Sequence, residues 1–186
     1  MSKACIFFAT GYEEIEALTV VDLLRRASVE AEMVSVTGER MVTSSHGVTV
    51  EMDKLFAEVD FETADMLVLP GGMPGTRNLE AFSPLMEQLD AFDKQEKYIA
   101  AICAAPSILG HRGMLKGKKA CAFPEFESHL EGAEVTGNPA VKSGHIITGR
   151  GMGCAIDFGL AIVETLQGKA AAAALADKVV YGHYQG

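Results

Sequence analysis

Short apolar runs alternate with amphipathic segments along the whole chain, and this alternation restricts the fold more than any other feature. The strand-like runs are residues 3–9, 30–36, 65–69 and 98–102. Residues 15–27 and 83–95 instead repeat apolar side chains with helical spacing. Strands that are apolar along their length belong in a parallel sheet covered by helices on both faces. The sequence therefore predicts a mostly parallel, doubly wound α/β fold, with residues 1–186 as one domain.

Weaker patterns predict the remaining elements. Residues 41–52 favour a hairpin or a pair of edge strands, and residues 155–166 and 169–179 favour helices. Short strands are expected around residues 119–123, 135, 141 and 146–148. Ser83 is predicted to cap the helix that follows it, with Pro84 in the first turn. Thr10 and Glu13 have the spacing of a capping box, which predicts that Glu13 and Glu14 face solvent.

Charge and cysteine usage exclude several classes of function. A net charge of -9 without a basic stripe argues against nucleic acid or an anionic membrane as the main partner. No apolar run approaches the roughly 18 residues of a membrane span, and the apolar patch near the N-terminus is too short for a secretory signal. We therefore expect a cytoplasmic protein. Its four cysteines form no CxxC pair or zinc-like spacing, so we expect free thiols and no metal site.

Three loops leave the carboxyl ends of predicted central strands: residues 10–14, 69–72 and 102–104. In a doubly wound sheet, ligands bind at this edge, where the strand order reverses. The three loops are therefore predicted to meet there and to form the functional site.

The stretch YIAAICAAPSILG places Cys103 at a corner between a strand and a helix. A nucleophile elbow needs small residues two positions on either side, which Ala101 and Ala105 provide. A helix N-terminus favours a thiolate, and reactive cysteines in such places have pKa values of about 3.5 to 7.5. The alternative is a buried structural cysteine, the commoner case among cysteines.

The other two loops supply possible partners for the thiol. Gly71 and Gly72 are either a simple turn or a place where the backbone approaches a ligand. In the second case, the amides of Gly72 and Ala104 would form a two-donor oxyanion hole. Glu16, on a helix flank, could point towards the sheet edge, where partial burial would raise its pKa and let it carry a proton.

Four motifs, GYEEIEA, LPGGMPG, AAICAAPSIL and TGRGMGCAIDFGLAIV, together resemble the ThiJ/PfpI superfamily, in the DJ-one branch that includes the parkinsonism-associated deglycase. The resemblance runs in order over nearly the whole chain. It implies a flavodoxin-like three-layer sandwich that is usually a homodimer. Members of that branch are described as cofactor-free glyoxalases acting on methylglyoxal, as deglycases acting on early glycation adducts, and as oxidation-sensing chaperones.

The resemblance assigns roles position by position. Cys103 matches the nucleophile and Glu16 its protonated carboxylic partner, while Gly72 and Ala104 match the backbone donors. Gly71 lies in the same motif and is expected to line the pocket.

Further along the chain, Arg150 and Gly151 match a loop at the mouth of the pocket. Two positions depart from relatives. Phe123 stands where some members carry a histidine, which places a Cys–His mechanism in doubt, and it is expected to line the pocket. Ala104 stands where the protease-like branch has histidine, so amidase or peptidase activity is disfavoured.

Together these patterns predict a cysteine-dependent glyoxalase or deglycase without a cofactor, whose substrate is a small 2-oxoaldehyde or an early glycation adduct. One alternative is an oxidative-stress sensor or redox-regulated chaperone in which Cys103 becomes a sulfinic acid. Another is a non-catalytic dimeric scaffold. A resolving role of Cys154 towards Cys103 stays open. The five histidines are expected at the surface or in turns, outside the site; they are His46, His111, His129, His145 and His183.

Overall fold

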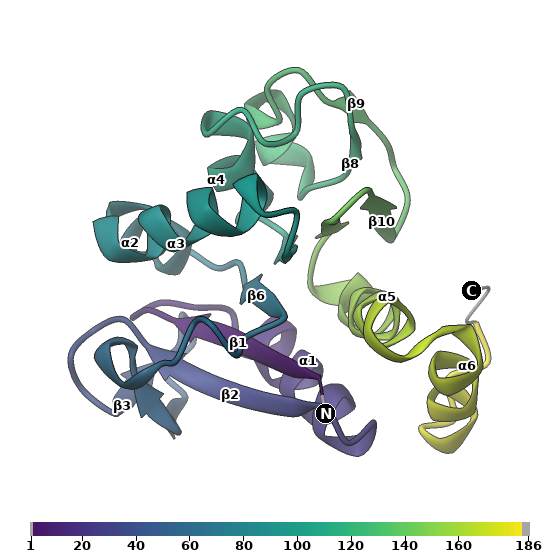
Figure 1. Ribbon diagram of the computed structural model, residues 1–186, viewed down its shortest axis with the longest axis horizontal. Helices are drawn as coiled ribbons and strands as arrows, with labels where there is room; N and C mark the ends of the chain where they lie inside the picture. Colours follow the sequence, from purple (N-terminus) through teal and green to yellow (C-terminus); the bar gives the residue numbers. More distant parts are fainter. Residues whose placement is uncertain (1, 184–186) are drawn as a thin grey trace.

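A computed structural model describes residues 2–183 as three layers, with a sheet between two sets of helices (Figure 1). Seven strands form the sheet in the order β10-β11-β7-β6-β1-β2-β5, and every neighbouring pair is parallel except β10 and β11. The strands are β1 (Lys3–Phe8), β2 (Glu30–Ser35), β5 (Lys54–Leu55), β6 (Met66–Leu69), β7 (Tyr98–Ile102), β10 (Ala140–Ser143) and β11 (Ile146–Gly149). The predicted doubly wound, flavodoxin-like sandwich is confirmed.

Helices cover both faces of the sheet. The α-helices are α1 (Glu14–Arg26), α2 (Gly75–Ala81), α3 (Ser83–Lys94), α4 (Pro106–His111), α5 (Ala155–Gln167) and α6 (Lys169–Lys178). Alternate residues of β1 point to opposite faces, so Ile6 belongs to the core shared with α1, α5 and α6, whereas Phe7 belongs to the core shared with α2, α3 and α4. Within the described residues, no helix is long and apolar enough to cross a membrane.

Smaller elements complete the fold. Residues 41–52 form the expected hairpin, an antiparallel pair of β3 (Met41–Thr43) and β4 (Thr49–Glu51) outside the main sheet. A second small sheet pairs β8 (Lys119–Ala120) with β9 (Glu134–Val135). Three short 3-10 helices are η1 (Phe56–Glu58), η2 (Pro124–His129) and η3 (Met152–Cys154).

The start of α3 differs from the prediction. Pro84 lies in the first turn as expected, but Phe82 occupies the capping position and no side chain caps the helix. The preceding helix α2 ends at Ala81, so the chain has no room for the extended residue that a Ser83 cap requires.

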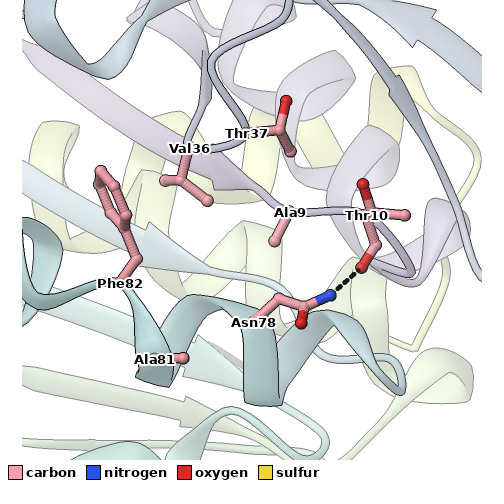
Figure 2. Close-up of a pocket in the computed structure, with 7 residues that line it drawn as sticks. All are labelled: Ala9, Thr10, Val36, Thr37, Asn78, Ala81 and Phe82. Atoms are coloured by element: carbon pink, nitrogen blue, oxygen red, sulfur yellow. Dashed lines mark hydrogen bonds between the residues drawn. The ribbon is translucent and has the colours of Figure 1, made fainter.

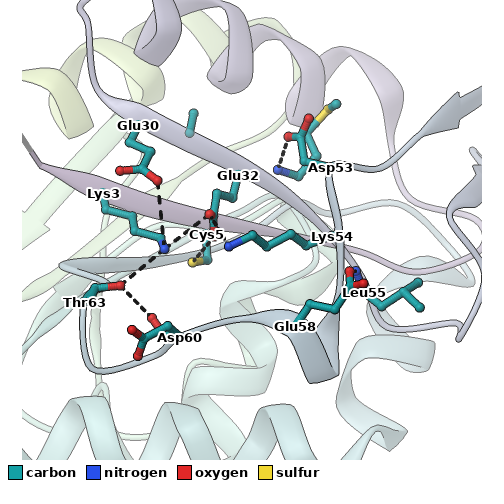
Figure 3. Close-up of polar contacts among 12 residues, drawn as sticks. Lys3, Cys5, Glu30, Glu32, Asp53, Lys54, Leu55, Glu58, Asp60 and Thr63 are labelled. Atoms are coloured by element: carbon teal, nitrogen blue, oxygen red, sulfur yellow. Dashed lines mark hydrogen bonds and ion pairs between the residues drawn. The ribbon is translucent and has the colours of Figure 1, made fainter.

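An ion-pair network joins β1, β2 and β5 (Figure 3). Glu32 accepts from Lys3 at 3.2 Å and from Lys54 at 2.6 Å, and the side chains of Lys3 and Glu32 are only 8% and 10% exposed. The buried thiol of Cys5 lies 3.8 Å from Glu32. Burial, together with the charge of Glu32, raises the pKa of this thiol to about 12, so Cys5 is a core residue, as predicted.

Candidate active site

The carboxyl ends of β1, β6 and β7 lie side by side, because the chain first adds β2 on one side of β1 and then β6 on the other. This reversal is the switch point at which doubly wound sheets bind ligands. Backbone hydrogen bonds join the loops there: the N–H of Glu13 donates to Gly71 O at 2.9 Å, and that of Gly75 to Gly11 O at 3.0 Å. The predicted meeting of these loops is confirmed.

Cys103 sits at the corner that follows β7. Its φ of 65° lies in the left-handed region, which a non-glycine residue occupies at a cost. Neighbouring segments hold this conformation: the N–H of Cys103 donates to Gly149 O at 2.9 Å, and its carbonyl accepts from the N–H of Phe123 at 2.9 Å. Ala101 and Ala105 are fully buried beside it. The half-buried thiol therefore leaves the strand at a fixed, strained elbow.

Glu16 lies in the first turn of α1 with none of its surface exposed. Glu13 is the capping residue of this helix, and its carboxylate accepts from the N–H of Glu16 at 2.7 Å. The predicted capping box with Thr10 is therefore wrong, as is the expectation that Glu13 faces solvent, since Glu13 is only 9% exposed. A capping contact across three residues does occur, but it joins Glu13 to Glu16 and not Thr10 to Glu13.

Gly71 connects the acid and the thiol. Its N–H donates to Glu16 Oε2 at 2.9 Å. A Cβ atom at Gly71 would lie 2.7 Å from Cys103 Cβ and 2.7 Å from Glu16 Oε2, closer than real side chains allow. Gly72 has a φ of 93° and its backbone packs against Tyr12 and Glu13. Glycine is therefore required at both positions, because the backbone there packs directly against Cys103, Glu16 and the loop after β1. A simple turn would not explain this requirement.

The ionisations of Glu16 and Cys103 are coupled. Burial raises the pKa of Glu16 to about 7, although its interactions with the Cys103 thiol and the Gly71 N–H oppose the rise. Burial, and then the negative charge of Glu16, raise the pKa of Cys103, while the amides of Ala104 and Gly72 lower it. The lowered pKa expected for Cys103 from the helix N-terminus is therefore not found, because burial and the charge of Glu16 outweigh the two amides. The first proton leaves the pair near pH 7, and the carboxyl group is the nearby acceptor for the thiol proton.

Three residues predicted for the pocket mouth lie together beside the elbow. Phe123 is 41% exposed, and a Cβ at Gly151 would be 3.5 Å from its ring. Arg150 donates to Gly137 O at 3.1 Å and lies 3.6 Å from the carboxylate of Glu127. The guanidinium group is thus held by two acceptors, the carbonyl of Gly137 and the carboxylate of Glu127.

Cys154 interacts with a different set of groups. Burial raises the pKa of its thiol, the charge of Asp157 raises it further, and Arg150 lowers it. Its charge also raises the pKa of the buried Cys121 thiol. The charged neighbours of Cys154 are therefore Asp157 and Arg150, whereas the charged neighbour of Cys103 is Glu16.

The histidines make their own contacts elsewhere. His46 pairs with Glu14, His145 with Asp93, and His111 with Glu80. Among the described residues, one group of at least three side chains could hold a metal: Glu13, Glu14 and His46 have ligand atoms within 4.8 Å of one another. His46 Nδ1 lies 3.0 Å from Glu14 Oε1, and the carboxylate of Glu13 accepts from the N–H of Glu16, so each of the three side chains already has a protein partner.

A cavity of about 260 Å³ opens near the ends of β1 and β2 (Figure 2). Ala9, Val36 and Phe82 form its apolar wall, and Asn78 donates to the carbonyl of Thr10 at 2.8 Å. No lining residue is acidic, basic or a thiol. Nucleophilic chemistry therefore belongs to the elbow and not to this cavity.

The chain is thus an α/β protein with a doubly wound sheet, a cysteine elbow at its switch point and a buried carboxyl group beside the thiol. A family model described as the DJ-1/PfpI family matches residues 2–165. The chain is therefore a member of the DJ-1/PfpI family, in the DJ-1 branch.

Individual relatives agree with this assignment. The chain is 36% identical over 172 residues to protein dj-1beta of Drosophila melanogaster, covering 91% of this chain and 92% of that protein. It is 31% identical over 157 residues to the glutathione-independent glyoxalase DJR-1.2 of Caenorhabditis elegans, covering 84% and 83%. The solved structure of oxidized Toxoplasma gondii DJ-1 superposes with a TM-score of 0.94 at 36% identity, covering 98% of this chain and 100% of that one.

Other relatives are longer. The chain spans 39% of the length of protein DJ-1 homolog B of Arabidopsis thaliana, to which it is 34% identical over 169 residues. The likeness to that protein therefore concerns one portion of it.

Proposed function

We propose that this protein is a cofactor-free glyoxalase or deglycase, in which Cys103 attacks a small 2-oxoaldehyde such as methylglyoxal or an early glycation adduct. The observation that supports this proposal most is the fully buried Glu16 carboxyl, whose pKa of about 7 suits proton transfer at neutral pH. A glyoxalase of C. elegans is among the relatives.

The reaction would begin with the pair carrying one proton. The sulfur of Cys103 forms a bond to the aldehyde carbon while the Glu16 carboxylate accepts the thiol proton. The carbonyl oxygen becomes an alkoxide, which the amides of Gly72 and Ala104 stabilise as an oxyanion hole. Glu16 then returns its proton to this oxygen, giving a hemithioacetal.

The second half of the reaction would move a proton between carbons. Glu16 removes the hydrogen from the former aldehyde carbon as a proton, which leaves an enediolate. The hydroxyl proton of the hemithioacetal then moves to the neighbouring oxygen, and Glu16 delivers its own proton to the adjacent carbon. The product is a thioester of a 2-hydroxy acid on Cys103. Water hydrolyses the thioester, so that methylglyoxal and water together become lactate and no electrons enter or leave. Every proton transfer to or from carbon in this sequence uses Glu16 as the base or the acid.

Substitution of either group tests the proposal. Cys103→Ser and Glu16→Gln should each abolish the conversion of methylglyoxal to lactate, while Cys154→Ser, which changes the other half-buried thiol, should leave it intact. Lactate formation at the wild-type rate in Cys103→Ser or Glu16→Gln would refute the mechanism.

A second candidate is an oxidative-stress sensor or redox-regulated chaperone. The half-buried thiol is accessible, and the structure of the Toxoplasma relative is described as oxidized. Mild peroxide followed by intact-mass measurement tests this function. Gain of two oxygen atoms in the wild type but not in Cys103→Ser supports it, whereas oxidation spread over several cysteines contradicts it.

The protein is further proposed to be a homodimer, as the family resemblance implies. An open hollow of about 500 Å³ between α1 and α5 offers a face for a second copy, with Leu18 and Ile156 among its lining residues. Light scattering coupled to size exclusion gives the mass directly, and a monomer at micromolar concentration would contradict the proposal.

A further inference from the structure

Three ionisable side chains from separate elements form a chain of contacts away from the Cys103 site. Glu80 of α2 lies 2.6 Å from His111 Nδ1, at the C-terminal end of α4. His111 Nε2 in turn lies 2.9 Å from Nδ1 of His129, at the end of η2. The two imidazole rings meet edge to face, with centroids 5.1 Å apart and an interplanar angle of 75°.

The carboxylate determines which nitrogen of His111 carries a proton. An ionised carboxylate can only accept, so His111 Nδ1 donates to Glu80 and neutral His111 presents the lone pair of Nε2 to His129. A carboxylate that fixes the ring and tautomer of a histidine in this way is the usual outer support of a metal-binding histidine.

The distance between the two nitrogens suits a shared metal ion. With metal–nitrogen bonds of about 2.0 to 2.1 Å, two nitrogens on one ion are about 2.9 Å apart at a right angle and about 3.3 Å apart at the tetrahedral angle. The observed 2.9 Å lies within this range. The two nitrogens now face each other across a hydrogen bond, so the rings would rotate about their side-chain bonds until both lone pairs point at the ion.

The backbone around the pair is closely packed. A Cβ atom at Gly110 would overlap the carbonyl oxygen of His129, so only glycine allows α4 and η2 to approach so closely. The side chain of His111 is 34% exposed, which leaves room for water molecules as the remaining ligands. The site is therefore both preformed and open.

We propose that His111 and His129 bind a late divalent transition metal such as Zn²⁺, Ni²⁺ or Cu²⁺, with Glu80 orienting His111 and water completing the coordination. Imidazole suits these metals better than Mg²⁺ or Ca²⁺. Without metal, the pair shares a hydrogen bond from His129 Nδ1. On binding, that proton moves through solvent to His129 Nε2, so both lone pairs face the ion and no electrons are transferred. The proposal is independent of the reaction assigned to Cys103.

Calorimetric titration with Ni²⁺ and Zn²⁺ tests the site in a full-length Cys103→Ser, Cys154→Ser background, which removes the two half-buried thiols as competing ligands. One ion per chain should bind at about pH 7.5 and dissociate on acidification to about pH 5.5, because protons compete for imidazole. His111→Ala and His129→Ala should each abolish this binding. Glu80→Gln, which keeps both imidazoles, should weaken it by about 10- to 100-fold.

His46→Ala is the matched control, because His46 also pairs with a carboxylate and belongs to the one group of three or more potential ligands among the described residues. This variant should bind metal as the background protein does. Binding that disappears in His46→Ala but persists in His111→Ala and His129→Ala would overturn the proposal. So would the absence of binding from the background protein while circular dichroism shows it to be folded.

Discussion

Replacing Glu16 by glutamine should change how the stability of the protein depends on pH. Glu16 has a pKa of about 7 in the folded state, against an ordinary value of 4.5. Because the folded pKa is raised, the folded state holds this proton more tightly than the unfolded chain. Its contribution is fully present below about pH 4.5 and is lost as the pH rises to about 7. At about 1.4 kcal/mol for each pH unit between these values, the loss is about 3 kcal/mol.

The assay is urea unfolding of wild type and Glu16→Gln between about pH 4.5 and about pH 8.5. The difference in unfolding free energy between the two proteins is followed across pH, because the effect of the substitution on packing is the same at every pH, whereas the effect of ionisation changes. The free energy of unfolding of the wild type, relative to the variant, should fall by about 3 kcal/mol up to about pH 7 and then stay constant.

Glu14→Gln provides a control of opposite sign. Burial raises the pKa of Glu14, but its own backbone N–H and His46 together have the larger effect, so its pKa lies below the ordinary value of 4.5. When unfolding is also measured down to about pH 3, the wild type should therefore gain stability relative to Glu14→Gln as the pH rises towards the ordinary carboxyl value of 4.5, and the difference should change little above it. A constant difference between wild type and Glu16→Gln over the whole pH range would refute the reasoning, because it would mean that Glu16 ionises normally in the folded protein.

Two further substitutions test the packing of the site and the fold. Gly71→Ala should destroy both activity and alkylation of Cys103, because the added Cβ would overlap Cys103 and Glu16. Gly153→Ala is the control: a Cβ there meets no atom within 4 Å, so this variant should behave as wild type. Equal methylglyoxal turnover in both variants would contradict the prediction. Glu32→Gln should destabilise the protein to urea by about 3 kcal/mol, because it leaves buried Lys3 with only the Glu30 carboxylate, at 4.0 Å, as a charged partner. An unchanged unfolding midpoint would show that the network is dispensable.

The sequence predicted most of the sheet and located the elbow because both depend on local patterns. Apolar runs of strand length predict the ends of the central strands to within one residue; for example, the run at residues 65–69 corresponds to β6. The alanines around Cys103 reported the tight corner, since larger side chains would not fit there. Helix α2 was not anticipated, because its seven residues contain too few apolar positions to show a helical repeat.

The electrostatics of the site depended on contacts that a local pattern does not contain. The sequence suggested a raised pKa for Glu16 but a lowered one for Cys103. The second expectation treated the helix terminus as the dominant effect, whereas α4 is only six residues long and the acid lies beside the sulfur. The bonds from Gly149 and Phe123 that hold the elbow come from residues more than fifteen positions away, so only the fold reveals them.

The rate at which iodoacetamide alkylates Cys103, measured by mass spectrometry as a function of pH, tests the proton transfer from thiol to carboxylate most directly. In the wild type the rate should rise through about pH 7, where Glu16 becomes able to accept the proton. In Glu16→Gln this inflection should be absent and the reaction should need higher pH. Superimposable profiles for the two proteins would contradict the account.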